Sequence, residues 1–357
     1  MNSSGPDLIC RRRQSYIAPA AVLIITSLLL LLFSVRFYTF VKSPNVDLHG
    51  KGYIYLYIPT GTDFNGLLKI LKEKSVLKNE RSFVFVARRK HYDVKVKAGK
   101  YRINNGISNN ELVNHLRSGR QVPVRLSLQN ARNLAELAGK LGHQVEADSA
   151  SLLMLFCDNA YLKQFGVNTE NVFVLFIPNT YEIFWNTSAR QLITKMSQEQ
   201  KAFWNRKRQG RLDSISMNIQ QVVTIASIIE KETNKDDEKP VMAGVYINRL
   251  HKNWPLQADP TVIFAWQDYS IKRVLASHLR IESPYNTYIH TGLPPGPICI
   301  PSVSSIDAVL NYRQHLYMYF CAKEDFSGYH NFAVSNAEHA RNAKKYQNSL
   351  DQMKIKQ

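Results

Sequence analysis

The residues most suited to chemistry lie in the segment VVTIASIIEKET, residues 222–233. An α-helix turns by about 100° per residue. Glu232 follows Ile225, Ile228 and Ile229 by seven, four and three positions, so all four side chains lie on the same face of a helix. A carboxyl group on an apolar face is costly to ionise, so its pKa is expected to rise. It then holds a proton near neutral pH, as a general acid must. The alternative is that Glu232 ends a core helix and pairs with a lysine or arginine.

Two further carboxyl groups are candidates for an auxiliary role. Glu230 lies two positions before Glu232, about 200° around the helix, and is expected to be structural or to support Glu232 indirectly. Asp259, in QADPT, is either an auxiliary group beside Glu232 or a turn residue that hydrogen-bonds its own backbone.

Composition limits the classes of protein to which this chain can belong. Its 357 residues are 45% hydrophobic, which excludes disorder by composition, and its formal net charge is +18. A basic surface suits an anionic partner: nucleic acid, acidic lipid or an anionic cell-wall polymer. The four cysteines form no CxxC pair and no cluster with zinc spacing, so no metal site is expected.

An uncharged run of 20 residues, Tyr16–Val35, is long enough to span a bilayer as a helix, and we assign the span to residues 16–36. A cleaved signal peptide is the alternative, but the run exceeds a typical signal core and no clear cleavage site follows. Arg11, Arg12 and Arg13 favour a cytoplasmic N-terminus, residues 1–15. Most of the chain would then lie outside the cytoplasm, which argues against nucleic acid as a partner.

The hydrophobic pattern predicts a small α/β domain followed by a larger, mainly helical region. Residues 37–51 are expected to be a short polar linker. The small domain, residues 52–127, is expected to contain strands at 53–58, 83–87, from 98 and at 120–128, and helices at 63–73 and 108–116. The second of these helices begins with a capping box, Ser108 with Glu111, and Gly119 suits its C-terminal cap. The helical region starts near Asn130.

Six motifs then follow in a fixed order: LFIPNTY (175–181), ASIIEKET (226–233), VYINRL (245–250), LQADPTV (256–262), SPYNTYIHTGLPPGPI (283–298) and GYHNFAVSNAEH (328–339). This series, behind a membrane anchor, resembles the YceG-like endolytic murein transglycosylases of the bacterial cell wall. The resemblance covers almost the whole chain. It implies an α+β protein with an N-terminal anchor, a LysM-like domain at 52–127 and a catalytic domain at 128–357.

The resemblance also implies an activity. The family cuts the β-1,4 bond between N-acetylmuramic acid and N-acetylglucosamine without water, because the muramic 6-hydroxyl closes onto C1 and leaves a 1,6-anhydro end. Its catalytic glutamate corresponds to Glu232, in agreement with the helical-face argument. No cofactor or metal is implied. The expected partners are peptidoglycan glycan strands and the inner membrane, with the catalytic domain outside the cytoplasm. The short linker adds the hypothesis that the enzyme cuts near the membrane, beside peptidoglycan synthases, and so limits strand length.

Polar and aromatic residues within these motifs are candidates for binding the glycan, since sugars are bound through ring faces and amide groups. Each has a structural alternative: a turn contact for Gln257, a hydrogen-bonded loop for the YNTY run. His330 and His339 are expected to be structural rather than catalytic. The expected substrate-binding residues are Gln257, Thr261, Tyr285, Asn286, Thr287, Tyr288 and Tyr181.

Two questions remain open at the level of sequence. A catalytically silent, membrane-anchored peptidoglycan-binding scaffold would keep the basic surface and aromatic cleft, yet need no protonated glutamate. Of the three cysteines after the membrane segment, Cys157, Cys299 and Cys321, buried free thiols are favoured over a bridge between the last two.

Overall fold

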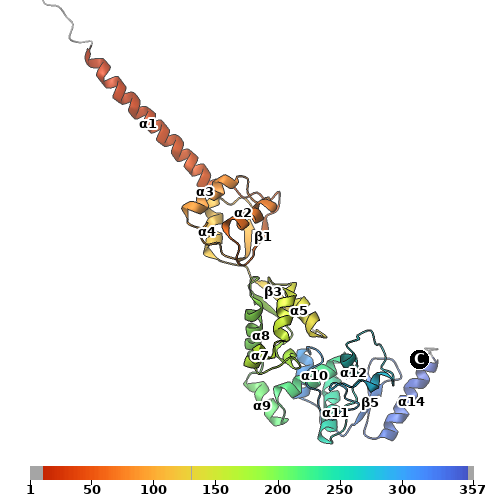
Figure 1. Cartoon of the computed structure of the whole chain (residues 1–357). Helices are drawn as coiled ribbons and strands as arrows, with labels where there is room; N and C mark the ends of the chain where they lie inside the picture. Colours follow the sequence, from red (N-terminus) through yellow and green to blue (C-terminus); the bar gives the residue numbers. More distant parts are fainter. Residues whose placement is uncertain (1–10, 130, 353–357) are drawn as a thin grey trace, which may run out of the picture. The chain divides into compact units, whose positions relative to one another are not determined.

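The computed structural model describes the backbone of residues 11–129 and 131–352, and the side chains of these residues from Ala21 onward. The chain divides into two compact units. The first runs to Pro123 and includes Phe184–Asn186; the second comprises Val124–Ile183 and the chain from Thr187. The first combines helices with one short antiparallel strand pair and the second with two, which confirms the α+β class (Figure 1).

The chain begins with one long helix, α1 (Arg11–Lys42). Its segment Ala21–Lys42 has a mean hydropathy of 2.2 and is long and apolar enough to cross a membrane. A membrane anchor and a signal sequence both meet this criterion. The orientation with residues 1–15 in the cytoplasm stays a prediction, and residues 1–10 lie outside the described residues.

The rest of the first unit is a two-stranded sheet packed against three helices. The elements are β1 (Tyr53–Ile58), α2 (Phe64–Glu73), α3 (Glu80–Arg89), β2 (Gly99–Asn104) and α4 (Asn109–Ser118). β1 and β2 pair antiparallel, and alternate residues of each strand enter the core. The expected capping box on Ser108 is present, and Gly119 ends α4 with a φ of 74° in the left-handed region that glycine favours.

The prediction of a strand at residues 83–87 is wrong, because this segment is the centre of helix α3. Asn79 caps the helix by accepting a hydrogen bond from the amide of Ser82. Phe83, Val86 and Ala87 are buried at helical spacing. A run of five apolar residues does not by itself distinguish a strand from a buried helical turn.

The segment expected to be a linker, residues 37–51, is folded for much of its length. Residues 37–42 are the last turns of α1, and the rings of Phe37 and Phe40 both meet Phe85 of α3 edge to face. Val46 and Leu48 are buried in the core of the first unit. Burial of these apolar side chains explains why the segment is ordered although its composition is polar.

The strand expected at residues 120–128 is shorter than predicted and belongs to the second unit. β3 (Val124–Leu128) pairs antiparallel with β4 (Asn179–Ile183), which lies some fifty residues later in the chain. The first unit therefore ends at Pro123 rather than at residue 127. A pairing between segments so far apart in sequence could not be read from local pattern.

The second unit consists mainly of helices around two clusters of buried apolar residues. Helix α10, which carries Glu232, lies in the second cluster, and a hairpin of two short strands precedes the last helix. Beyond β3 and β4, the unit contains α5 (Leu134–Gly142), α6 (Ser149–Phe156), α7 (Asn159–Leu162), η1 (Lys163–Phe165), η2 (Val172–Leu175), α8 (Ala189–Phe203), α9 (Arg206–Ser214), α10 (Ile219–Glu232), α11 (Lys239–His251), α12 (Asp259–Trp266), η3 (His278–Arg280), α13 (Val303–Leu310), β5 (Tyr319–Ala322), β6 (His330–Ala333) and α14 (Asn336–Gln352).

Cys157, Cys299 and Cys321 are free thiols in the part of the chain that the structure describes. Cys157 is exposed, whereas Cys299 is buried and donates a hydrogen bond of 3.4 Å to the carbonyl of Ser227. A bridge between Cys299 and Cys321 is not formed.

Candidate active site

Glu232 is the last residue of α10, and the helix is fixed at both ends. Asn218 and Gln221 form a capping box at its start, and Thr233 leaves the helix in an extended conformation. Ile225, Ile228 and Ile229 are fully buried in the surrounding core. The apolar face inferred from the sequence is therefore confirmed, and it places the Glu232 carboxyl group at the boundary between that core and a cavity.

The surroundings of Glu232 favour its protonated form. Burial, and to a smaller extent the negative charge of Asp259, raises the pKa of Glu232 to about 7. Tyr246, on α11, opposes the shift because its hydroxyl donates a hydrogen bond of 2.8 Å to Oε1 and thereby stabilises the carboxylate. A group with such a pKa can give up a proton and take one back near neutral pH.

The cavity at Glu232 has a volume of about 380 Å³. It is formed within the second unit by side chains from α10, α11, α12, β5, α14 and two loops. The residues that line it are Glu232, Arg249, Gln257, Asp259, Tyr288, Tyr319, Phe320, Asn336 and His339. The cavity thus joins two carboxyl groups with several aromatic rings and amides, a combination suited to a polar ligand with apolar ring faces.

Asp259 and Tyr288 are joined in one wall of the cavity. The Tyr288 hydroxyl donates a hydrogen bond of 2.5 Å to Oδ1 of Asp259, which is the first residue of α12. A carboxylate at a helix N-terminus is also stabilised by the helix dipole. Gln257 precedes this helix with a φ of 48°, and its backbone amide donates to the carbonyl of Thr287, so it is held in a tight turn.

Arg249 lines the cavity and connects three segments of the chain through hydrogen bonds. Its side chain is buried, and its guanidinium donates to the carbonyls of Met318 and Leu256. Its positive charge lowers the pKa of Glu232, although less than burial raises it. Because the guanidinium is already engaged by two backbone carbonyls, its first role is to hold the cavity wall together.

The far side of the cavity is an aromatic pair. The rings of Tyr319 and His339 stack with centroids 5.3 Å apart and an interplanar angle of 20°. Burial, and secondarily the charge of Arg249, lowers the pKa of His339, so this imidazole is neutral at physiological pH. Its Nδ1 is buried and has no hydrogen-bond partner among the described residues.

Several of the expected binding residues lie behind the cavity rather than in its lining. The hydroxyls of Thr261 and Thr287 are 2.8 Å apart and buried. Asn286 is fully buried and donates to the carbonyls of Leu279 and Ile281, so it holds the loop that presents Tyr288. Of the seven expected residues, the structure brings Gln257 and Tyr288 to the cavity.

Tyr285 and Tyr181 make structural contacts elsewhere in the second unit. Tyr285 donates a hydrogen bond to the carbonyl of Glu170, and its ring packs on Phe264. Tyr181 is buried in the other apolar cluster, where its hydroxyl donates a hydrogen bond of 2.6 Å to the carbonyl of Ile177.

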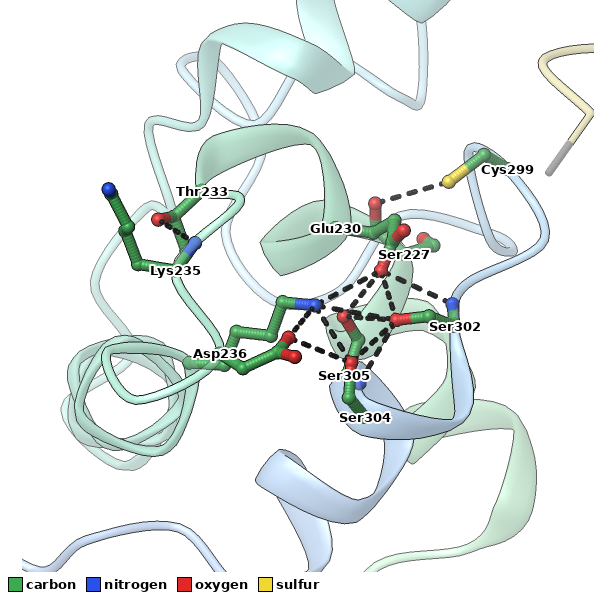
Figure 2. A network of polar contacts seen from close by, with 10 residues as sticks. Ser227, Glu230, Thr233, Lys235, Asp236, Cys299, Ser302, Ser304 and Ser305 are labelled. Carbon is green, nitrogen blue, oxygen red and sulfur yellow. Dashed lines mark hydrogen bonds and ion pairs between the residues drawn. The ribbon is translucent and has the colours of Figure 1, made fainter. Parts of the chain in front are cut away.

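Glu230 is not part of the cavity lining and instead belongs to a network of polar contacts (Figure 2). Its Oε2 accepts hydrogen bonds of 2.5 Å from the hydroxyls of Ser302 and Ser305, and it pairs with Lys239 at 3.6 Å. Lys239 in turn pairs with Asp236 at 2.7 Å. The network joins the end of α10 to α11 and α13, two residues before Glu232.

Sequence reasoning did not assign five of the cavity residues a binding role. Arg249 falls within the VYINRL motif, together with Tyr246, and Asn336 and His339 fall within GYHNFAVSNAEH. The motifs therefore contained the signal, but spacing alone could not show that α14 and β5, about ninety residues after Glu232, meet it in space. Tyr319 and Phe320 lie outside all six motifs and carried no such signal. Among the described residues, no group of three or more His, Cys, Asp or Glu side chains could hold a metal ion.

Comparison with known proteins settles the family. The model of the YceG-like family matches residues 56–345, which covers most of both units outside α1 and every residue of the cavity. The chain belongs to the YceG-like family. This YceG-like chain is 27% identical over 323 residues to a Bacillus subtilis protein named endolytic murein transglycosylase, covering 86% of this chain and 88% of that one.

Two further comparisons agree with this membership. A Streptococcus pneumoniae protein with the same name is 26% identical over 340 residues, covering 85% of this chain but 60% of the longer relative. A crystal structure of a YceG-like protein from Listeria monocytogenes superposes with a TM-score of 0.54 at 28% identity, covering 82% of this chain and 99% of that one. The resemblance read from the six motifs is thus confirmed.

Proposed function

We propose that this YceG-like protein is an endolytic murein transglycosylase in which Glu232 is both the general acid and the general base. The observation that carries the proposal is the position of Glu232, whose pKa is raised to about 7 at the edge of a cavity rich in aromatic and polar groups. The names of its relatives support the substrate class.

In the proposed reaction, protonated Glu232 donates its proton to the glycosidic oxygen as the bond from C1 of N-acetylmuramic acid breaks. The N-acetylglucosamine end leaves as an alcohol. The resulting carboxylate then takes the proton from the muramic 6-hydroxyl as that oxygen bonds to C1, which closes the 1,6-anhydro ring. Glu232 regains its proton, and no water is consumed. Because the attacking hydroxyl belongs to the substrate, proximity replaces a bound nucleophile.

Asp259 supports this chemistry through its charge. Ordinary glycosidases use two carboxyl groups, whereas here the Asp259 carboxylate is engaged by Tyr288. We assign it the stabilisation of positive charge on the oxocarbenium-like transition state and the upward shift of the Glu232 pKa. Gln257 and Tyr288 are proposed to bind the sugar directly, with Tyr319 and His339 as the opposite platform. Thr261, Tyr285, Asn286, Thr287 and Tyr181 would then shape the second unit behind the cavity.

We further propose that α1 anchors the protein in the cytoplasmic membrane with both units outside the cytoplasm. The enzyme would then act on nascent strands near the synthases and limit their length. The apolar segment Ala21–Lys42 supports the anchor, and the LysM-like character of the first unit remains a prediction.

The test is mass spectrometry of uncrosslinked glycan strands incubated with the full chain in detergent. New 1,6-anhydromuramic ends are expected from the wild type, with a loss of about 10²–10⁴-fold in Glu232→Gln, as for removal of a general acid–base group. Hydrated reducing ends would instead identify a hydrolase with Asp259 as its second carboxylate. Strand binding without cleavage would identify the scaffold.

A further inference from the structure

Helix α3 packs against α1 with its basic end toward the apolar segment of α1 (Figure 1). The uncharged run of α1 ends at Val35, and Phe37 is two residues, about 3 Å, beyond it. The guanidinium of Arg89, the last residue of α3, lies 5.9 Å from the ring centroid of Phe37. The start of α3 lies beyond the other end of this contact, because Asn79 and Asn45 exchange hydrogen bonds of 2.8 and 2.9 Å there.

Further cations gather around Arg89. Arg88 is its exposed neighbour, and Lys90 is the C-terminal cap of α3. Burial, and secondarily the charges of Arg117 on α4 and Lys42 on α1, lowers the pKa of Lys90, so these three cations lie close together. We call the set Arg36, Lys42, Arg88, Arg89, Lys90 and Arg117 the basic cluster.

The charge of the basic cluster is not neutralised by the protein. Among the residues that the structure describes, none of its members forms an ion pair with a carboxylate. Nζ of Lys90 donates to the neutral side-chain oxygens of Asn110 and Asn114. Glu111 lies near the cluster, but its carboxylate is already held by the amide and hydroxyl of Ser108. Cations held together in this way repel one another, so an external anion would stabilise them.

Exposed aromatic rings lie beside the basic cluster. Phe37 is 38% exposed, Tyr38 64% and Phe85 44%, and Phe85 meets the rings of Phe37 and Phe40 edge to face. The opposite face of α3 supplies the core of the first unit, so these rings are not needed there. Aromatic rings at the end of an apolar helix are typical of the boundary between a membrane and water.

We propose that the basic cluster binds anionic phospholipid headgroups of the outer leaflet, so that the first unit lies against the bilayer surface. This rests on the membrane anchor of the proposed function. The headgroup layer is about 5–8 Å deep, and the Arg89 guanidinium lies beside a residue only about 3 Å beyond the uncharged run. It therefore reaches the lipid phosphates without any movement of the first unit. A guanidinium also matches the geometry of a phosphate, to which it can donate two hydrogen bonds.

The basic cluster should also affect the tilt of α1 in the bilayer. Except for Arg36 and Lys42, its members lie on α3 and α4, the helices that pack against α1, so the charge is larger on one side of α1. Tilting α1 toward that side brings the cations to the headgroups, and tilting it the other way lifts them off. Anionic lipid would therefore favour the first of these tilts.

Lipid selectivity can be measured on the full chain in bilayers by electron spin resonance of spin-labelled phosphatidylglycerol and phosphatidylcholine. The fraction of each lipid immobilised at the protein gives their relative association constant. We expect the wild type to prefer phosphatidylglycerol, and added salt to weaken this preference. The triple change Arg88→Gln, Arg89→Gln and Lys90→Gln should lower it at least threefold, since one cation near an anionic surface contributes roughly fivefold.

Matched variants separate this effect from net charge and from folding. Lys69→Gln with Lys72→Gln and Lys74→Gln removes the same charge from α2 and should leave the preference as in the wild type. Arg88→Lys with Arg89→Lys keeps the charge and should retain most of it. Because Arg88 and Arg89 are exposed, Arg88→Gln with Arg89→Gln provides the same test if thermal unfolding shows that the triple variant is not folded.

An unchanged preference for phosphatidylglycerol in the triple variant would overturn the proposal, and so would an equal loss in the α2 control. Release of the full chain from membranes by alkaline carbonate would overturn the anchor, and the lipid-binding role with it. Cleavage is a separate result. Absence of anhydro ends, with a lipid preference that depends on the basic cluster, would remove the transglycosylase alone. Anhydro ends with a preference independent of the cluster would remove the lipid proposal alone.

Discussion

Tyr246 and Asp259 act in opposite directions on the pKa of Glu232. The hydroxyl of Tyr246 lowers it by stabilising the carboxylate, and the charge of Asp259 raises it. Since the proposed mechanism requires protonated Glu232, the rate should fall as pH rises through about 7. The two neighbours therefore set the upper end of the pH range in which the enzyme works.

Tyr246→Phe should move the alkaline limb of the pH–rate profile upward, because the carboxylate loses a hydrogen-bond donor. Asp259→Asn should move it downward, because a repelling charge is removed. Each shift is expected to be roughly 0.5–1 pH unit, equivalent to about 1 kcal/mol. Rates of anhydro-end formation between pH 5 and 9 would measure both. Shifts in the same direction would contradict this assignment.

Stability should depend on pH through the same group. The pKa of Glu232 is raised from 4.5 unfolded to about 7 folded, so the folded state binds the extra proton between these values. The stabilisation is complete below pH 4.5 and is lost as pH rises through 7. The loss is of the order of 1–3 kcal/mol, given about 1.4 kcal/mol per pKa unit and some access of water.

Glu232→Gln should abolish this part of the pH dependence, so that the variant exceeds the wild type in unfolding temperature at pH 8 but not at pH 4.5. Thermal unfolding at the two pH values would show it. If the unfolding temperatures of the variant and the wild type differ by the same amount at both pH values, the carboxyl group of Glu232 is not desolvated.

At the scale of elements, the end of α10 is held by the network around Glu230. Lys239 is nearly buried, with 6% of its side chain exposed, and it pairs with both Glu230 and Asp236. Asp236 is 72% exposed, so its pairing with Lys239 is weakened by solvent. Glu230 also accepts from two serine hydroxyls, so its removal leaves several partners unsatisfied.

Glu230→Ala should therefore cost about 2–4 kcal/mol of stability, whereas Asp236→Ala should cost under about 1 kcal/mol. Because the last turn of α10 carries Glu232, the first change should also lower kcat more than it raises KM. Unfolding temperatures and kinetics of the two variants provide the comparison. Equal effects would show that the network does not position the helix.

How much the sequence could predict differs between elements. The helix around Glu232 was predictable because its apolar face repeats over several turns. The segment at 83–87 was misassigned because β-propensity is a weak guide where tertiary burial decides. In the YNTY run, neighbouring residues take different roles: Asn286 and Thr287 are buried and Tyr288 lines the cavity. A loop has no period from which such a division could be read.

At the scale of the whole molecule, α1 is part of the fold of the first unit. Phe37 and Phe40 meet Phe85, Val41 packs against the core, and the carbonyl of Phe40 accepts from Asn109. Removing residues 1–36 should leave these contacts in place. Removing residues 1–42 should destabilise the first unit by about 1–3 kcal/mol, because the partly buried side chains of Phe40 and Val41 are lost from it. Hydrogen exchange of α3 and α4 in the two truncated proteins would distinguish them.

The absence of a flexible joint between α1 and the first unit also has a consequence for orientation. An α-helix is stiff against twisting over this length, so any rotation of α1 about its own axis turns the first unit through the same angle. With α1 in the bilayer as proposed, the β1–β2 sheet of the first unit then has a fixed direction about the membrane normal. A neighbouring membrane protein that bound one side of α1 would thereby set the direction in which this sheet points, although it contacts only residues within the lipid.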